Sequence, residues 1–211
     1  MMNFDFTQEE KDFQKEVEDF VKHELPPDWD DRAVFWPGGY GTFPDMETEF
    51  IEFSRQFFLK LGAKGWLSLG WPEEYGGRNS MMRQAIVNDV LTYYRAPFGI
   101  LTYSIVGPAI CHVGGEKTKK EWLPRIGNGE ILFWIGYSEP NSGSDLSSIK
   151  TTAVPDGDDY VINGQKIWSS QAHVADYCWL LARTDPEAPK HRAASVFIVD
   201  NTTPGIDIRP L

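Results

Sequence analysis

The sequence predicts an α+β protein, in which an N-terminal α-helical domain is followed by an antiparallel β domain. Before Ile131, apolar side chains recur every three or four residues, which is the period of an amphipathic helix. From Ile131 onward, short runs rich in β-branched and aromatic residues alternate with turn-forming residues, as is typical of strands. We therefore expect a helical domain over residues 1–130 and an incomplete β domain over residues 131–211.

The first helix is predicted over residues 7–25. Thr7 and Glu10 have the spacing of a capping box, in which each side chain bonds the backbone N–H of the other residue. Two consecutive prolines then end the helix, because proline cannot continue the helical hydrogen-bond ladder. Residues 26–44 are rich in proline, glycine and aromatic residues, and we expect a long ordered loop there.

The second helix is predicted to begin after Asp45 as its cap and to be closed by Gly62. One side of this helix carries an apolar, largely aromatic stripe at helical spacing, which predicts core packing rather than a cofactor site. The stripe consists of Phe50, Phe53, Phe57, Phe58 and Leu61. A turn-rich connection over residues 66–77 should follow, and then helices over residues 80–96, 102–113 and 116–126.

Six strands are predicted in the second domain, separated by Pro-Asp-Gly, Asn-Gly and Pro-Glu-Ala-Pro turns. Their expected ranges are residues 131–137, 151–154, 160–162, 166–169, 177–183 and 194–200.

Charge and composition exclude several function classes. The net charge of −11 argues against nucleic-acid and anionic-membrane partners, because no concentrated basic face offsets the repulsion. Cys111 and Cys178 are isolated and the histidines show no ligand spacing, so we expect buried thiols in a reducing compartment and no metal site. No apolar run is long enough to span a membrane and no secretory signal is recognisable, so we expect a soluble cytoplasmic protein.

Two polar segments carry the most information about function. The first is the loop Gly136–Asp145, which can direct backbone N–H groups and serine hydroxyls at one anionic or carbonyl-rich ligand, with Asn141 and Gly143 free to adopt positive φ. The second, Asn163–Ser170, pairs the indole of Trp168 with a nearby hydroxyl, which suits a flat aromatic ligand. From these residues alone, a plain hairpin loop followed by a strand stays an open alternative.

Together the two segments resemble the flavin-binding part of the acyl-CoA dehydrogenase family. The family's loop pattern is filled by Ser138, Glu139, Ser142, Gly143, Ser144 and Asp145, and the run Asn-Gly-Gln-Lys-Ile-Trp follows at the family's spacing. The resemblance extends over essentially the whole chain, including the run Gly-Trp-Pro-Glu-Glu-Tyr-Gly-Gly at residues 70–77. Two positions depart from the pattern: Tyr137 replaces a smaller aliphatic residue, and Ser170 replaces the commoner threonine.

The resemblance implies an FAD-dependent α,β-dehydrogenation of an acyl-CoA thioester. It assigns flavin binding to Ile135, Gly136, Tyr137, Ser138, Gly143, Ser144, Trp168, Ser169 and Ser170. Ser144 matches a position that also contacts the acyl-CoA, whereas we expect structural roles for Glu139 and Asp145. Tyr137 with the following Ser-Glu-Pro resembles bacterial members that act on bulkier acyl groups, including steroid-derived ones, although it does not specify the chain length.

The family continues into a third, helical domain that supplies the catalytic glutamate, and no residue of this chain matches that glutamate. We therefore expect the chain alone to be inactive, and the intact protein to form a homo- or hetero-tetramer that passes electrons to an electron-transferring flavoprotein. Two alternatives stay open at this point: an oxygen-using flavoenzyme of the acyl-CoA oxidase type, and a non-catalytic subunit or fragment.

Overall fold

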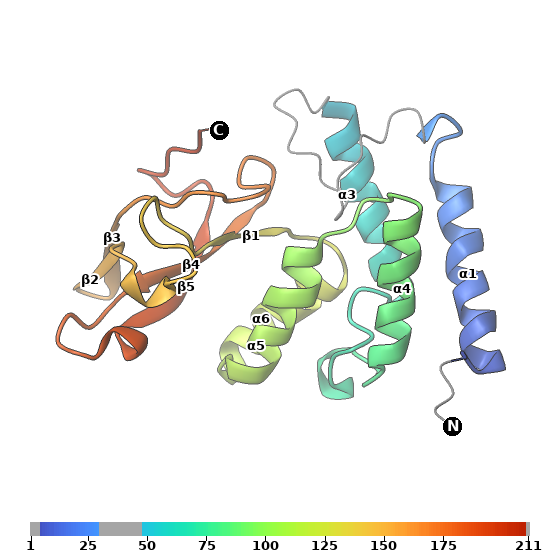
Figure 1. Cartoon of the computed structure of the whole chain (residues 1–211), viewed down its shortest axis with the longest axis horizontal. Coiled ribbons are helices and arrows are strands. Elements are labelled where there is room, and N and C mark those ends of the chain that lie inside the picture. Colours follow the sequence, from blue (N-terminus) through green and yellow to red (C-terminus); the bar gives the residue numbers. More distant parts are fainter. Residues whose placement is uncertain (1–4, 30–47, 210–211) are drawn as a thin grey trace. The chain divides into compact units, whose positions relative to one another are not determined.

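The computed structural model describes residues 5–29 and 48–209. The chain divides into two compact units, residues 1–130 and residues 131–211 (Figure 1). Helices make up the first unit and a five-stranded sheet the second, which confirms the α+β class. Most of the loop expected over residues 26–44, and the expected cap Asp45, lie outside the described residues.

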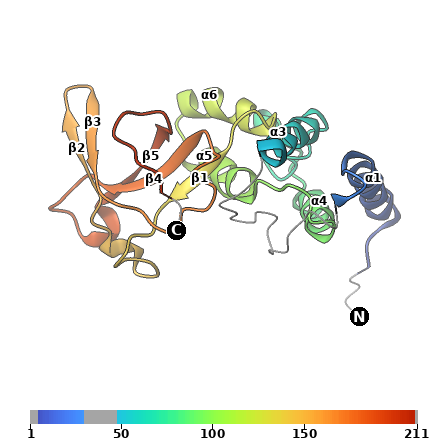
Figure 2. The same ribbon diagram turned by 90° about the horizontal axis from the view of Figure 1, so that it is seen from above.

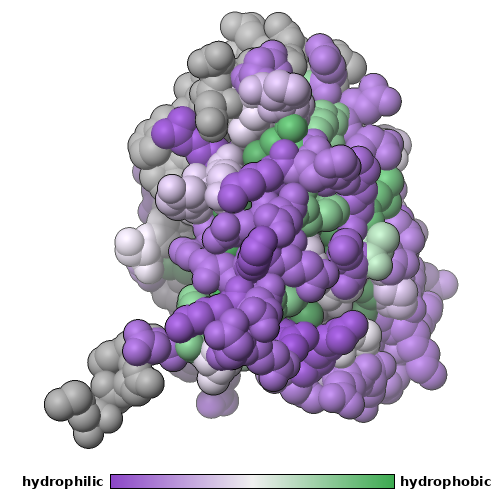
Figure 3. Space-filling view, turned by 90° about the vertical axis from the view of Figure 1, so that its right-hand side faces the viewer, coloured by the Kyte–Doolittle hydropathy of each residue, from purple (hydrophilic) through white to green (hydrophobic). Residues whose placement is uncertain are grey.

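The first helix, α1 (Gln8–Glu24), begins as the sequence predicts. The Thr7 side chain accepts from the Glu10 N–H at 3.3 Å, and a Glu10 carboxylate oxygen accepts from the Thr7 N–H at 2.7 Å. The buried side chains Phe13, Val17 and Val21 recur at intervals of four residues, so α1 packs one face inward. The side of the unit that carries α1 is otherwise largely hydrophilic, with small apolar areas between polar side chains (Figure 3).

Four further α-helices follow among the described residues: α3 (Thr48–Ala63), α4 (Met81–Tyr93), α5 (Gly107–Val113) and α6 (Glu116–Gly127). A short 3₁₀ turn, η1 (Glu73–Tyr75), lies in the turn-rich connection. The prediction that Gly62 closes α3 is wrong, because Gly62 lies inside the helix. A Cβ there would fall 2.1 Å from the Asn128 carbonyl oxygen, so this glycine allows close packing instead.

The helix expected over residues 102–113 is two elements. A π-helical segment, η2 (Leu101–Val106), precedes α5, which has a proline in its first turn. Pro108 has no N–H to donate to the preceding turn, so the hydrogen-bond pattern changes before it.

The aromatic stripe of α3 packs in the core of the first unit, as predicted. Phe57, Phe58 and Leu61 are fully buried, and Phe50 stacks on Trp29 with ring centroids 5.5 Å apart.

The sheet of the second unit is built around β4. The strands are β1 (Phe133–Gly136), β2 (Thr152–Asp156), β3 (Asp159–Asn163), β4 (Tyr177–Arg183) and β5 (Ala194–Asp200). Strand order is β1-β4-β2-β3, and β5 pairs with β4. Figure 2 shows the β2–β3 hairpin rising from one end of this sheet.

Two details of the predicted β domain are wrong. The sheet is mixed, because β1 and β2 both pair with β4 in parallel; neither joins β4 through a hairpin, so no tight turn imposes the antiparallel direction. Residues 166–169 form no strand, because Trp168 adopts φ +59°, which extended backbone does not allow.

Candidate functional site

The two polar segments singled out from the sequence lie against each other in the second unit. The Ile167 N–H donates to the carbonyl oxygen of Ser138 at 2.9 Å. The Lys166 ammonium donates to the carbonyl oxygen of Tyr137 at 3.1 Å and to a carboxylate oxygen of Glu139 at 2.9 Å. The segment that carries Trp168 is therefore joined to the start of the serine-rich loop.

Glu139 is the anchor of that loop. Its carboxylate accepts from the backbone N–H groups of Lys150 at 2.6 Å and of Thr151 at 2.9 Å, and forms an ion pair with Lys166. Burial by itself raises the pKa of this carboxyl, but the hydrogen bonds from these three residues outweigh burial and lower the pKa to about 2. Glu139 is thus ionised at neutral pH and fully engaged by donors, which fits the structural role expected of it.

The rest of the loop is closed by its own hydrogen bonds. Glu139 and Ser142 exchange two backbone bonds of 2.8 and 3.0 Å, and the Ser142 hydroxyl donates to the Asp145 carbonyl oxygen at 2.6 Å. The Asp145 carboxylate accepts from the hydroxyls of Ser148 and Ser147, which lower its pKa. These bonds lie around η3 (Leu146–Ser148), so Asp145 also has a structural part.

Positive φ occurs elsewhere than expected. Neither Asn141 nor Gly143 is among the residues with positive φ, because the reciprocal bonds close the loop without a left-handed residue. Trp168 and Gln171 instead adopt φ +59° and +67°, which costs a residue with a side chain about 1 kcal/mol or more.

The segment from Trp168 to Gln171 has further signs of a functional surface. The Trp168 side chain is 73% exposed, which is unusual for an indole. The Ser169 hydroxyl and the side-chain amide oxygen (Oε1) of Gln171 are buried without a hydrogen-bond partner. Buried polar groups are normally paired, so strain, an exposed ring and two unmet polar atoms in four residues indicate a ligand surface.

Gly136 and Tyr137, also assigned to the flavin, support the sheet. A Cβ on Gly136 would fall 2.9 Å from both the Cys178 sulfur and a Leu180 methyl carbon, so glycine is needed for packing. The Tyr137 hydroxyl accepts from the Trp179 indole N–H at 2.9 Å. Burial raises the pKa of the Cys178 thiol to about 12, and both cysteines are buried free thiols, as predicted.

The remaining assigned residues differ in exposure. Ile135 and Ser138 are half-buried, whereas Gly143, Ser144 and Ser170 are exposed. A Cβ on Gly143 would meet nothing within 4 Å, so its backbone is open to a closely approaching group. Within the described residues, no hydrogen bond or ring contact joins Gly143 or Ser144 to Trp168.

Sequence reasoning missed Lys166 and Gln171. A lysine next to a predicted turn is normally solvated, and its burial against Glu139 depends on a contact distant in the sequence. No local sequence pattern marks Gln171 as a residue of the candidate site.

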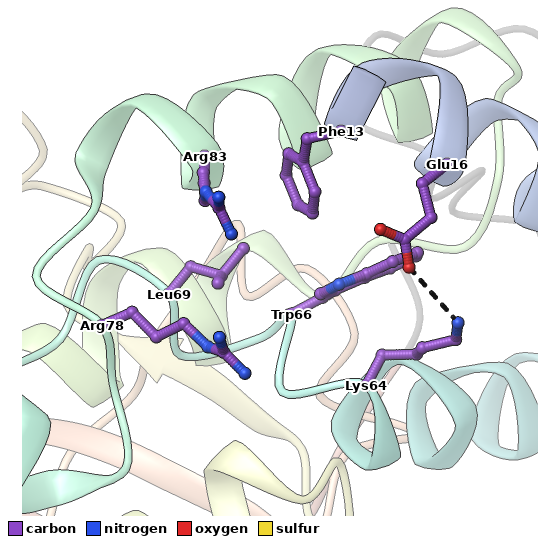
Figure 4. A pocket seen from close by; sticks show the side chains of 7 residues that line it. All are labelled: Phe13, Glu16, Lys64, Trp66, Leu69, Arg78 and Arg83. Carbon is purple, nitrogen blue, oxygen red and sulfur yellow. Dashed lines mark ion pairs between the residues drawn. The ribbon is translucent and has the colours of Figure 1, made fainter. Parts of the chain in front are cut away.

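A separate hollow of about 160 Å³ lies in the helical unit (Figure 4). It is lined by Phe13, Glu16, Lys64, Trp66, Leu69, Arg78 and Arg83. Lys64 pairs with Glu16 at 3.5 Å, and the Arg83 guanidinium lies 5.1 Å from the centre of the Phe13 ring. No residue expected in a cofactor site lines this hollow.

Comparison with protein families accounts for both units. Residues 7–130 match the N-terminal domain of acyl-CoA dehydrogenases, and residues 135–211 match their middle domain. The chain belongs to the acyl-CoA dehydrogenase family. Among the described residues of this acyl-CoA dehydrogenase chain, no helix is both long and apolar enough to cross a membrane.

Several relatives of this acyl-CoA dehydrogenase chain are similar over its whole length. Acyl-CoA dehydrogenase FadE26 of Mycobacterium tuberculosis is 40% identical over 214 residues, which cover 100% of this chain and 52% of the relative. The solved structure of a steroid ACAD, Tcur3481-Tcur3483, has a TM-score of 0.81 at 40% identity and covers 94% of this chain and 49% of that one.

The ChsE4-ChsE5 complex from Mycobacterium tuberculosis also has a TM-score of 0.81, at 39% identity over 95% of this chain and 49% of that one. The chain thus spans about half the length of the relatives that it matches.

Proposed function

We propose that this chain provides the flavin-binding surface, and part of the acyl-CoA-binding surface, of an FAD-dependent acyl-CoA dehydrogenase. One observation carries the proposal: the hydrogen bond between Ser138 and Ile167 joins the two segments that the sequence assigns to the flavin. Ser138 and Trp168 are thereby held in one region of the second unit, although they lie on separate segments of the chain.

The side chains in this region fit a flavin. The exposed Trp168 ring offers an apolar aromatic face to a flat ring system. The Ser138 N–H donates to no acceptor within the described residues, and the Ser169 hydroxyl is buried without a partner. Donors beside an aromatic face suit a heteroaromatic ring whose edge carries carbonyl and imino groups.

Each of these residues has a proposed part in the reaction. When bound, FAD supplies the acceptor for the hydride that leaves the β-carbon of the acyl group. The backbone N–H of Ser138 orients the ring edge, Trp168 packs beside the ring, and the Ser170 hydroxyl donates near the reacting end. Ser144, exposed on the loop, is proposed to contact the acyl-CoA.

The base that removes the α-proton is proposed to lie outside these two domains. A general base near neutral pH needs a carboxylate that is free to accept a proton. Glu139 is held ionised by three donors, and Asp145 is bonded by two serines, so neither carboxylate of the loop suits this role.

The relatives also suggest a substrate class and an assembly. The Tcur3481-Tcur3483 structure is described as a steroid ACAD. Its name and that of the ChsE4-ChsE5 complex each join two different proteins. We therefore propose a bulky, steroid-derived acyl-CoA as substrate and a hetero-oligomer as the working form, with electrons passing to an electron-transferring flavoprotein.

The full-length protein provides the test. It should bind FAD with quenching of flavin fluorescence, and a saturated acyl-CoA should bleach the bound flavin under anaerobic conditions. Slow re-oxidation by air would support a dehydrogenase, whereas rapid re-oxidation would favour the oxidase alternative. Absence of FAD binding in the full-length protein and its assembly would refute the proposal.

A further inference from the structure

Lys166 is the least expected buried group of the second unit. Its side chain and that of Glu139 are each only 7% exposed, and their charged atoms lie 2.9 Å apart. Burying an ion pair removes both charges from water, and well-packed apolar residues are often at least as stabilising. The pair therefore calls for a role besides stability.

The second contact of Lys166 indicates that role. Its ammonium also donates to the Tyr137 carbonyl oxygen at 3.1 Å. In a planar trans peptide, the carbonyl of one residue and the N–H of the next point in opposite directions. Lys166 therefore fixes the Tyr137–Ser138 peptide so that the Ser138 N–H points away from the ammonium.

Other contacts hold the next peptide in place as well. The Ser138 carbonyl accepts from the Ile167 N–H, and the Glu139 N–H donates to the Ser142 carbonyl. The Ser138 N–H itself has no acceptor in the part of the chain that the structure describes. A cation bonded to the carbonyl end of a peptide also polarises that peptide and strengthens its N–H as a donor.

We propose that Lys166 is a positioning residue, which aims and strengthens the Ser138 N–H as a hydrogen-bond donor to the edge of the flavin ring. This inference rests on the proposed function, since it requires a flavin at Ser138. Glu139 balances the charge of the ammonium and does not itself touch the flavin. Because reduction places negative charge on that edge, the donor stabilises the reduced flavin more than the oxidised one.

Three variants of the full-length protein in its native assembly separate this role from a merely structural one. Lys166→Met removes the hydrogen bond from the ammonium to the Tyr137 carbonyl oxygen. Glu139→Gln removes the ion pair but keeps that hydrogen bond. The double variant Glu139→Gln/Lys166→Met leaves no unpaired buried charge. It therefore tests the contact between Lys166 and the Tyr137 carbonyl even if Lys166→Met alone fails to fold. Lys60→Met, which breaks the more exposed pair between α3 and Glu24, is the control.

The readouts are the FAD dissociation constant, the flavin's visible spectrum and its reduction potential. Loss of one charge-assisted contact predicts about tenfold weaker stabilisation of reduced flavin, which lowers a two-electron potential by about 30 mV. Lys166→Met and the double variant should show this shift with an altered spectrum, whereas Glu139→Gln and Lys60→Met should keep the wild-type potential.

A measurement on the unaltered protein is independent of any variant. FAD should slow hydrogen exchange of the backbone amide of Ser138. If wild-type protein binds FAD but this amide is not protected, the inference and the part proposed for the Ser138 N–H are both wrong. If the potential is unchanged in the double variant, the inference alone is wrong. In both cases the proposed FAD binding stands. If wild-type protein binds no FAD, the proposed function itself is wrong.

Discussion

The indole N–H of Trp179 donates to the hydroxyl of Tyr137 at 2.9 Å, so the residue after β1 is fixed to the central strand β4. Tyr137 is also where the loop departs from the aliphatic residue common in the family. Tyr137→Phe should lower the free energy of unfolding by about 1–3 kcal/mol, because it leaves the N–H of the buried Trp179 unpaired.

Chemical denaturation of the full-length protein measures this change. Tyr160→Phe is a matched control, since Tyr160 is half exposed and should tolerate the change within about 0.5 kcal/mol. Equal losses for the two variants would contradict a specific role of the Tyr137 hydroxyl.

The exposed ring of Trp168 should matter for flavin binding rather than for folding. Trp168→Ala should weaken FAD binding about fivefold or more, because an aromatic contact contributes about 1 kcal/mol. Fluorescence titration with FAD tests this, with Tyr93→Ala as the control, since Tyr93 is 78% exposed on the helical unit. An unchanged affinity of the Trp168 variant would place the flavin elsewhere.

Glu139 should contribute stability that depends on pH. Its pKa is depressed to about 2 in the folded chain, below the ordinary value of 4.5. A depressed pKa stabilises the fold above the unfolded pKa, and the contribution disappears as the pH falls from about 4.5 through about 2. The whole contribution is on the order of 3 kcal/mol.

Unfolding free energies at several pH values, for the wild type and for Glu139→Gln, test this expectation. The difference between the two proteins should be largest at neutral pH and shrink in acid. A difference independent of pH would mean that the Glu139 carboxyl has an ordinary pKa.

Gly164 should be intolerant of a side chain. A Cβ there would fall 2.2 Å from the Thr151 hydroxyl oxygen and 2.7 Å from its Cα, so Gly164→Ala must push apart the segments that carry Thr151 and Gly164. The overpacking should cost about 1–3 kcal/mol. Thermal unfolding measures it, and Gly143→Ala, which meets open space, should unfold like the wild type.

The 211-residue chain alone should show no dehydrogenase activity, because both carboxylates of its loop are committed to hydrogen bonds. Loss of a general base lowers the rate by about 10²–10⁴. Anaerobic mixing of the chain, FAD and a saturated acyl-CoA measures flavin reduction directly. Rapid reduction would reveal a base within these residues.

Local patterns predicted the elements whose cause is local. The capping box of α1 and the apolar runs of β4 and β5 appear where the sequence places them, because periodicity and turn residues specify them. The strand predicted over residues 166–169 is absent because the conformation of this segment has no local cause. Its backbone depends on Glu139 and Ser138, which are distant in the sequence, and no local pattern reports such contacts.

The same contrast holds for the candidate site. The serines, the glycines and the tryptophan were assigned to the flavin through the family resemblance and stay predictions, whereas the buried Lys166 and the unpaired side-chain oxygen of Gln171 had no signal in the sequence. The parallel pairing of β1 with β4 was also missed, because a strand's direction is set by its partner and not by its own sequence.

The late position of β4 in the sequence affects how the second unit folds during synthesis. Synthesis produces β1 and the serine-rich loop well before Tyr177–Arg183, the strand that supports them. Until then, β1 has no parallel partner and Tyr137 has no indole to hold it. Long-range pairing forms slowly, so we expect the serine-rich loop to become ordered only after β4 is made, and β1 to stay unpaired and open to aggregation until then.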